Sequence, residues 1–78
     1  MIFDKIVEIM MDHLSIQPQD ITPETSFKED LAIDSLDLYD LVTALEDEFN
    51  IEVPSERQGE IETMEDLVKI LKELGVEE

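Results

Sequence analysis

Ser35 is the side chain best suited to covalent chemistry in this sequence, because it stands between Asp34 and Leu36 at the predicted start of a helix. A serine there can cap the helix, since its hydroxyl accepts a hydrogen bond from an unpaired backbone amide of the first turn. It can also receive a phosphate ester from another enzyme, because the N-terminus of a helix favours an anion. The serine and its neighbours taken alone leave both interpretations open.

Ser35 is a poor candidate for a hydrolytic nucleophile. No Gly-x-Ser-x-Gly elbow surrounds it, and the only histidine, His13, is predicted on a different helix. His13 lies near the C-terminal end of that helix, where a histidine interacts favourably with the helix dipole. We assign it no function. We therefore expect no catalytic residue, and a protein that is not an enzyme.

The aspartates around Ser35 raise the question of a metal site. Asp30, Asp34, Asp37 and Asp40 could bind a divalent cation weakly, but the segment lacks the glycine and the terminal glutamate of an EF-hand loop. The chain contains no cysteine, so it has no disulfide and no thiolate ligand. We expect no metal site.

The helix predicted from Ser35 to Phe49 has two apolar faces. At 100° per residue, one face lies within roughly 60° of Leu38 and forms a core stripe with Leu41, Val42, Leu45 and Phe49. The opposite side carries apolar residues among carboxylates, which is typical of a docking surface. We predict that this docking surface comprises Leu36, Asp37, Tyr39, Asp40, Thr43, Glu46 and Asp47.

Two further long helices are predicted. Apolar residues at helical spacing indicate a first helix over Ile2 to Leu14. Thr63 and Asp66 form the pattern of a capping box at the start of the last helix, which ends at Gly75. The buried stripe expected for the last helix is Met64, Leu67, Val68, Leu71 and Leu74.

The remaining segments connect these helices. Residues 15–33 contain two prolines and no clear periodicity, and we predict a packed loop held by Ile16, Ile21, Phe27 and Leu31. Asn50 ends the second long helix, residues 51–54 form an extended connector, and Ser55 caps a short turn that reaches about Glu60. The predicted fold is all-α, a small bundle of three main helices plus one short helix, with the long packed loop between the first and second helices.

Composition limits the partners. The chain has 78 residues and a net charge of −17, from 22 acidic and 5 basic side chains. Such a surface repels nucleic acid and anionic membranes and favours partners with basic patches. No apolar run approaches the length of a membrane span, and no signal-peptide pattern opens the chain, so we expect a cytoplasmic protein without stable membrane insertion.

The segment Phe27-Lys28-Glu29-Asp30-Leu31-Ala32-Ile33-Asp34-Ser35-Leu36 resembles the pattern Phe-x-x-Asp-Leu-Gly-x-Asp-Ser-Leu of the acyl carrier protein family. The resemblance continues through Leu45-Glu46-Asp47-Glu48-Phe49 and Ile51-Glu52-Val53-Pro54, and in length and helix order it spans the whole chain. It implies a single domain over residues 1–78, of the discrete bacterial type.

The resemblance implies that Ser35 carries 4′-phosphopantetheine, attached covalently from coenzyme A, and that Asp34 and Leu36 help to present it. The chain would shuttle acyl groups as thioesters between separate enzymes of fatty acid biosynthesis. The partners implied are a phosphopantetheinyl transferase, and fatty acid synthesis enzymes and acyltransferases with basic patches that read the docking surface. We expect a monomer.

Four residues depart from the family pattern, and two of them, Arg57 and Gly59, interrupt the acidic character of the short third helix. Ala32 replaces a glycine, which would strain the loop by roughly 1 kcal/mol if the position has a positive φ. Tyr39 is larger than the expected aliphatic residue. The alternatives are a specialised carrier for polyketides, lipid A or another single acid, and an acidic adaptor that is never modified and in which Ser35 is only a cap.

Overall fold

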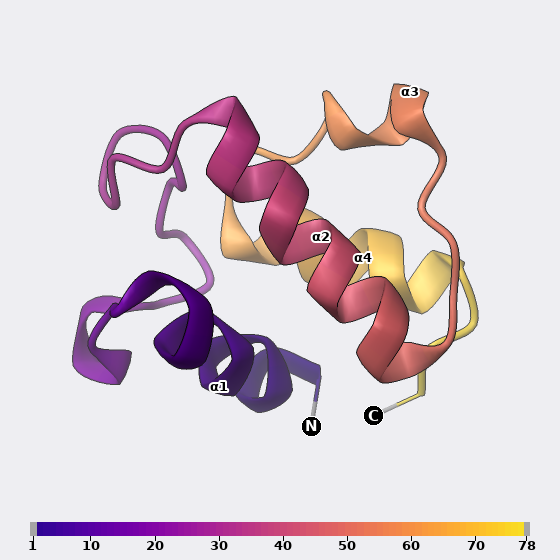
Figure 1. The fold of residues 1–78 in the computed structure, drawn as a ribbon, viewed down its shortest axis with the longest axis horizontal. Helices are drawn as coiled ribbons and strands as arrows, with labels where there is room; N and C mark the ends of the chain where they lie inside the picture. Colours follow the sequence, from indigo (N-terminus) through magenta and orange to yellow (C-terminus); the bar gives the residue numbers. More distant parts are fainter. Residues whose placement is uncertain (1, 78) are drawn as a thin grey trace.

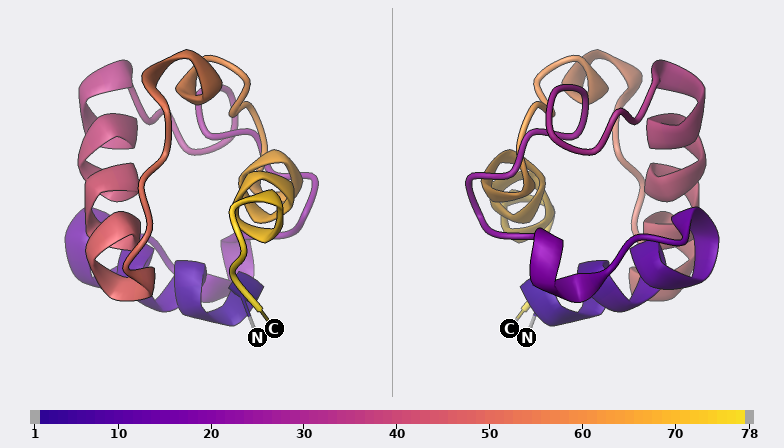
Figure 2. Two further views of the ribbon diagram at one scale, coloured as in Figure 1. Left: turned by 90° about the vertical axis from the view of Figure 1, so that its right-hand side faces the viewer. Right: turned by 90° about the vertical axis from the view of Figure 1, so that its left-hand side faces the viewer.

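The computed structural model describes residues 2–77. Its helices are α1 (Ile2–Leu14), the 3-10 helix η1 (Pro18–Asp20), α2 (Ser35–Phe49), α3 (Ser55–Gln58) and α4 (Met64–Glu73) (Figure 1). Figure 2 shows α1, α2 and α4 on three sides of a common interior, with α3 and part of the loop before α2 along the fourth side. The predicted all-α bundle is confirmed.

The interior is filled by side chains from the three long helices, because each helix has one apolar face. Fully buried residues are Ile6 and Met10 from α1, Leu41 and Leu45 from α2, and Met64, Leu67 and Leu71 from α4. No helix within residues 2–77 is both long enough and apolar enough to cross a membrane.

The ends of α2 follow from its capping residues. The carboxylate of Asp34 accepts a hydrogen bond from the backbone amide of Asp37 over 2.9 Å, which satisfies an amide that the helix itself cannot pair. At the other end Asn50 has φ 55°, the left-handed conformation that stops a helix. The predicted range of this helix is confirmed, and Asp34 is its cap.

The loop between α1 and α2 is packed, as predicted, since Ile21 and Phe27 are buried. It also holds the start of α4 through its backbone. The carbonyl of Pro23 accepts from the amide of Glu65 over 2.9 Å, and the carbonyl of Thr25 accepts from the amide of Met64 over 3.1 Å. These are amides of the first turn of α4, so the loop completes the capping of that helix.

Two expectations for the C-terminal half are wrong in detail. Ser55 does not cap α3, because it is already the first helical residue and Pro54 precedes it without a side-chain hydrogen bond. In α4 the capping box of Thr63 and Asp66 is present as predicted. The predicted stripe of α4 omits Ile70, which is buried, although it includes two residues that are only half-buried, Val68 and Leu74.

Candidate functional site

Ser35 is exposed at the first position of α2. The cap of the helix is the carboxylate of Asp34, so the serine hydroxyl is not needed for capping. Within residues 2–77 the Ser35 side chain makes no hydrogen bond. The hydroxyl is therefore free to react, and it lies at the helix end whose dipole stabilises an anion.

The backbone before Ser35 is held by a left-handed residue and a buried one. Ala32 has φ 54°, the conformation that the usual glycine adopts without strain. Ile33 is buried, and its amide donates to the carbonyl of Phe27 over 2.8 Å. This arrangement turns the loop so that Asp34 and Ser35 leave it at the surface, and it confirms that Ala32 occupies a strained position.

A cleft of about 720 Å³ opens beside Ser35, between the loop, the start of α2 and the segment from α3 to α4. Its apolar lining includes Phe27, Ile33, Leu38 and Ile61. Its remaining lining is formed by Glu24, Ser26, Lys28, Glu29, Asp30, Asp34, Ser35, Gln58, Gly59, Glu62 and Thr63. A group attached to Ser35 thus has an apolar floor and a polar rim next to it.

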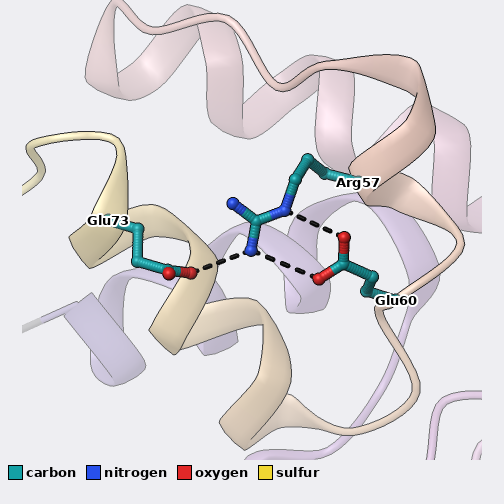
Figure 3. Close-up of polar contacts among 3 residues, drawn as sticks. All are labelled: Arg57, Glu60 and Glu73. Atoms are coloured by element: carbon teal, nitrogen blue, oxygen red, sulfur yellow. Dashed lines mark hydrogen bonds and ion pairs between the residues drawn. The ribbon is translucent and has the colours of Figure 1, made fainter.

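The α3 side of the cleft is tied to α4 by one arginine. Arg57 donates from Nε to Oε2 of Glu60 over 3.0 Å and from Nη2 to Oε2 of Glu73 over 2.9 Å (Figure 3). The hydrogen bond from Arg57 lowers the pKa of Glu73 below its ordinary value, and the hydrogen bonds to Glu73 and Glu60 raise the pKa of Arg57. Since α3 has no buried residue, this network is a main side-chain link from α3 to α4.

Five of the seven residues of the predicted docking surface are exposed on α2, and their role in docking stays a prediction. Leu36 is 69% exposed and Tyr39 is 57% exposed, which leaves two large apolar side chains in water next to the candidate attachment serine. Thr43 is also exposed, and its hydroxyl donates to the carbonyl of Tyr39 over 3.0 Å. Asp40, which lies between Tyr39 and Thr43 in the sequence, is exposed as well.

A second groove, of about 590 Å³, runs along α2 beside the end of α1. Four predicted docking residues line it: Asp37, Asp40, Thr43 and Asp47. His13, to which the sequence assigns no function, lies in the same groove. Its position could not be read from the sequence, because it depends on how α1 packs against α2.

Glu46, which the sequence places on the predicted docking surface, makes a contact inside the protein instead. Its side chain is half-buried, and its Oε2 accepts a hydrogen bond from the backbone amide of Val53 over 2.7 Å. The carboxylate therefore holds the connector between α2 and α3 against the body of the protein. A local sequence pattern does not reveal this role, because the partner lies seven residues away in an extended segment.

The residues at the site fit a covalently attached phosphate ester with an extended organic chain. The hydroxyl of Ser35 is exposed and has no competing hydrogen bond in the part of the chain that the structure describes. The helix N-terminus suits the phosphate, and the apolar floor of the cleft suits a chain of carbon atoms. No cluster of metal-ligating side chains is found within residues 2–77.

Comparisons with known proteins agree with this geometry. A family model described as "Phosphopantetheine attachment site" matches residues 4–71. The acyl carrier protein of Wolinella succinogenes is 44% identical over 71 residues, which cover 91% of this chain and 93% of that protein. The crystal structure of an acyl carrier protein from Thermotoga maritima is similar with a TM-score of 0.84 and 33% identity, over 94% of this chain and 85% of that chain.

Proposed function

The chain belongs to the acyl carrier protein family, which implies a covalently attached phosphopantetheine, and on this premise we propose that Ser35 is the attachment residue. We further propose that residues 1–78 form one carrier domain. The single observation that carries the assignment is the exposed Ser35 hydroxyl, which forms no hydrogen bond with any described residue and lies beside the apolar cleft.

The other serines of the chain lack this combination. The hydroxyl of Ser26 accepts from the amide of Glu29 over 3.1 Å. Ser15 follows the C-terminal end of α1, where the helix dipole disfavours a phosphate. Ser55 begins a helix of four residues and does not line the cleft.

In the proposed modification, the Ser35 oxygen attacks the phosphorus of coenzyme A that bears the pantetheine group. The bond between Oγ and phosphorus forms, the pyrophosphate bond breaks, and adenosine 3′,5′-bisphosphate leaves. The serine proton passes to a base of the transferase, because no side chain within residues 2–77 is hydrogen-bonded to Ser35. Asp34 contributes by fixing the first turn of α2 that presents the hydroxyl.

The attached arm supplies a terminal thiol that carries an acyl group as a thioester. The chain itself has no cysteine, so no side chain competes for the acyl group. We propose that the protein performs no catalysis and passes acyl intermediates between separate cytoplasmic enzymes of fatty acid biosynthesis. A flexible arm raises the effective concentration of the thioester at each enzyme that binds the carrier.

The partners proposed are the phosphopantetheinyl transferase, and acyltransferases and synthesis enzymes with basic patches. Leu36 and Tyr39 provide an exposed apolar contact, and Asp40 and Asp47 add negative charge on the same helix. With a net charge of −17, association is steered by charge and is salt-dependent.

The attachment residue is tested by incubating the purified apo protein with coenzyme A and a phosphopantetheinyl transferase. We expect the wild type to gain one phosphopantetheine by intact mass, and Ser35→Ala to gain none. The matched control, Ser55→Ala, is expected to gain the arm like the wild type. Modification of Ser35→Ala would contradict the proposal.

A further inference from the structure

Lys28 is unusual among the basic residues, because within residues 2–77 its side chain has no polar partner. It is exposed and lines the cleft next to Ser35. The chain offers 22 acidic side chains against 5 basic ones, so a lysine without a carboxylate partner stands out. Lys5 pairs with Glu48, and Arg57 pairs with Glu60 and Glu73. The charge of Lys69 acts on Glu73, whose pKa it helps to lower, and Lys72 also has an interaction with another group.

A short turn of the backbone connects Lys28 to the candidate attachment site. The amide of Ile33 donates to the carbonyl of Phe27 over 2.8 Å. This bond closes the turn of residues 28–32, which carries Lys28 and leads directly into Asp34 and Ser35. Lys28 and Ser35 also line one cleft, so a phosphorus atom on the Ser35 oxygen would lie at the cleft that Lys28 borders.

The cleft is otherwise strongly negative. Its acidic lining residues are Glu24, Glu29, Asp30, Asp34 and Glu62, and Lys28 is the only lysine or arginine among its lining residues. Two of the carboxylates are occupied by backbone amides, since Asp30 accepts from Ser26 and Asp34 accepts from Asp37. A phosphodiester on Ser35 would add a negative charge beside these carboxylates, and the like charges repel each other. A nearby cation offsets this repulsion and so stabilises the modified protein.

We propose that Lys28 forms an ion pair with the phosphodiester on Ser35 and so acts as a positioning residue for the arm. This inference rests on the proposed attachment at Ser35. A charge-assisted hydrogen bond from Nζ to a phosphate oxygen would anchor the phosphate end of the arm at the cleft. The remainder of the arm, beyond the phosphate, is left free to reach an enzyme.

The test compares the apo and modified forms of the wild type, Lys28→Gln and Lys69→Gln. Both variants lose one positive charge, but Lys69 lies on α4 and does not line the cleft. The measured quantity is the Tm of the modified form minus the Tm of the apo form, at low salt. We expect Lys28→Gln to lower this difference by about 2–4 °C relative to the wild type, and Lys69→Gln to leave it unchanged.

Two further measurements separate an ion pair from a general effect on folding. High salt should bring the wild-type difference down to that of Lys28→Gln, because salt screens an exposed pair. The phosphorus NMR resonance of the modified protein should move in Lys28→Gln, stay in place in Lys69→Gln, and return toward the wild-type position in Lys28→Arg.

The outcomes distinguish the two proposals. If intact mass shows no arm on the wild type, the attachment at Ser35 is wrong and the inference on Lys28 falls with it. If the arm is attached but Lys28→Gln matches Lys69→Gln in both the Tm difference and the phosphorus resonance, the role of Lys28 is overturned while the attachment stands.

Discussion

The backbone amide of Val53 donates a hydrogen bond to Oε2 of Glu46 over 2.7 Å, so a carboxylate of α2 holds the connector that leads to α3. Val53 is buried and Glu46 is half-buried. The connector in turn positions α3, whose last residue, Gln58, and the following Gly59 line the cleft beside Ser35. Glu46 is therefore part of the structure that shapes the site.

Replacing Glu46 with alanine should destabilise the protein by about 1–2 kcal/mol, because the amide of Val53 loses its charged acceptor. The free energy of unfolding in urea measures the effect. Asp47→Ala is the matched control: it removes the same charge from an exposed position and should change stability by less than about 0.5 kcal/mol. Equal stability of the two variants would show that the Glu46 bond contributes nothing.

Replacing Ala32 with glycine should stabilise the protein by about 0.5–1 kcal/mol. Ala32 has φ 54°, and glycine adopts that conformation without the steric cost of a Cβ, although it also loses more entropy on folding. Ala44→Gly, inside α2, should instead lose about 1 kcal/mol. A destabilised Ala32→Gly would mean that the left-handed conformation at this position carries no strain.

Replacing Leu36 with alanine should lower kcat/KM of the transferase about tenfold while the stability stays within about 0.5 kcal/mol of the wild type. The reason is that the side chain is 69% exposed and adjoins Ser35. Met11, which is 44% exposed on α1, serves as the control, since Met11→Ala removes an exposed apolar side chain away from α2. If both variants are modified at the wild-type rate, α2 is not the docking surface for the transferase.

Replacing Arg57 with glutamine should loosen α3, because it removes the bonds to Glu60 and Glu73. Both partners are exposed, so amide hydrogen exchange in residues 55–60 should rise by less than about tenfold. Exchange in α2 should not change.

The same variant should reveal a pH dependence. The pKa of Glu73 is lowered, chiefly by its hydrogen bond from Arg57. The bond therefore stabilises the folded protein above the ordinary glutamate pKa, about 4.3, and this stabilisation is lost as the pH falls through the lowered pKa of the folded state. The difference in Tm between the wild type and Arg57→Gln should be constant from neutral pH to about pH 5 and disappear in stronger acid. A difference that persists there would contradict the ion pair.

Local patterns predicted the helices and the two faces of α2 well. The 100° repeat separates the buried Leu41 and Leu45 from the exposed Leu36 and Tyr39, and the structure has them so. The capping box at Thr63 was also readable, because its two partners lie within one turn. Such signals depend on residues that are close in the sequence.

The contacts that shape the site were not readable from local patterns. Asp34 and Ser35 are both good capping residues, so only the geometry assigns the cap to Asp34 and leaves the serine free. The bond from Arg57 to Glu73 joins residues sixteen positions apart. The position of Lys28 at the cleft depends on the turn between Phe27 and Ile33. Each of these three contacts depends on the tertiary structure, and the spacing of residues along a helix does not predict it.

The central claim is that the hydroxyl of Ser35 is the one that carries the arm. The most direct measurement is mass spectrometry of the protein isolated from its own host, with the modified residue located by peptide fragmentation. The account predicts one phosphopantetheine, on Ser35. A chain that is unmodified in the cell, or that carries the arm on Ser15, Ser26 or Ser55, would contradict it.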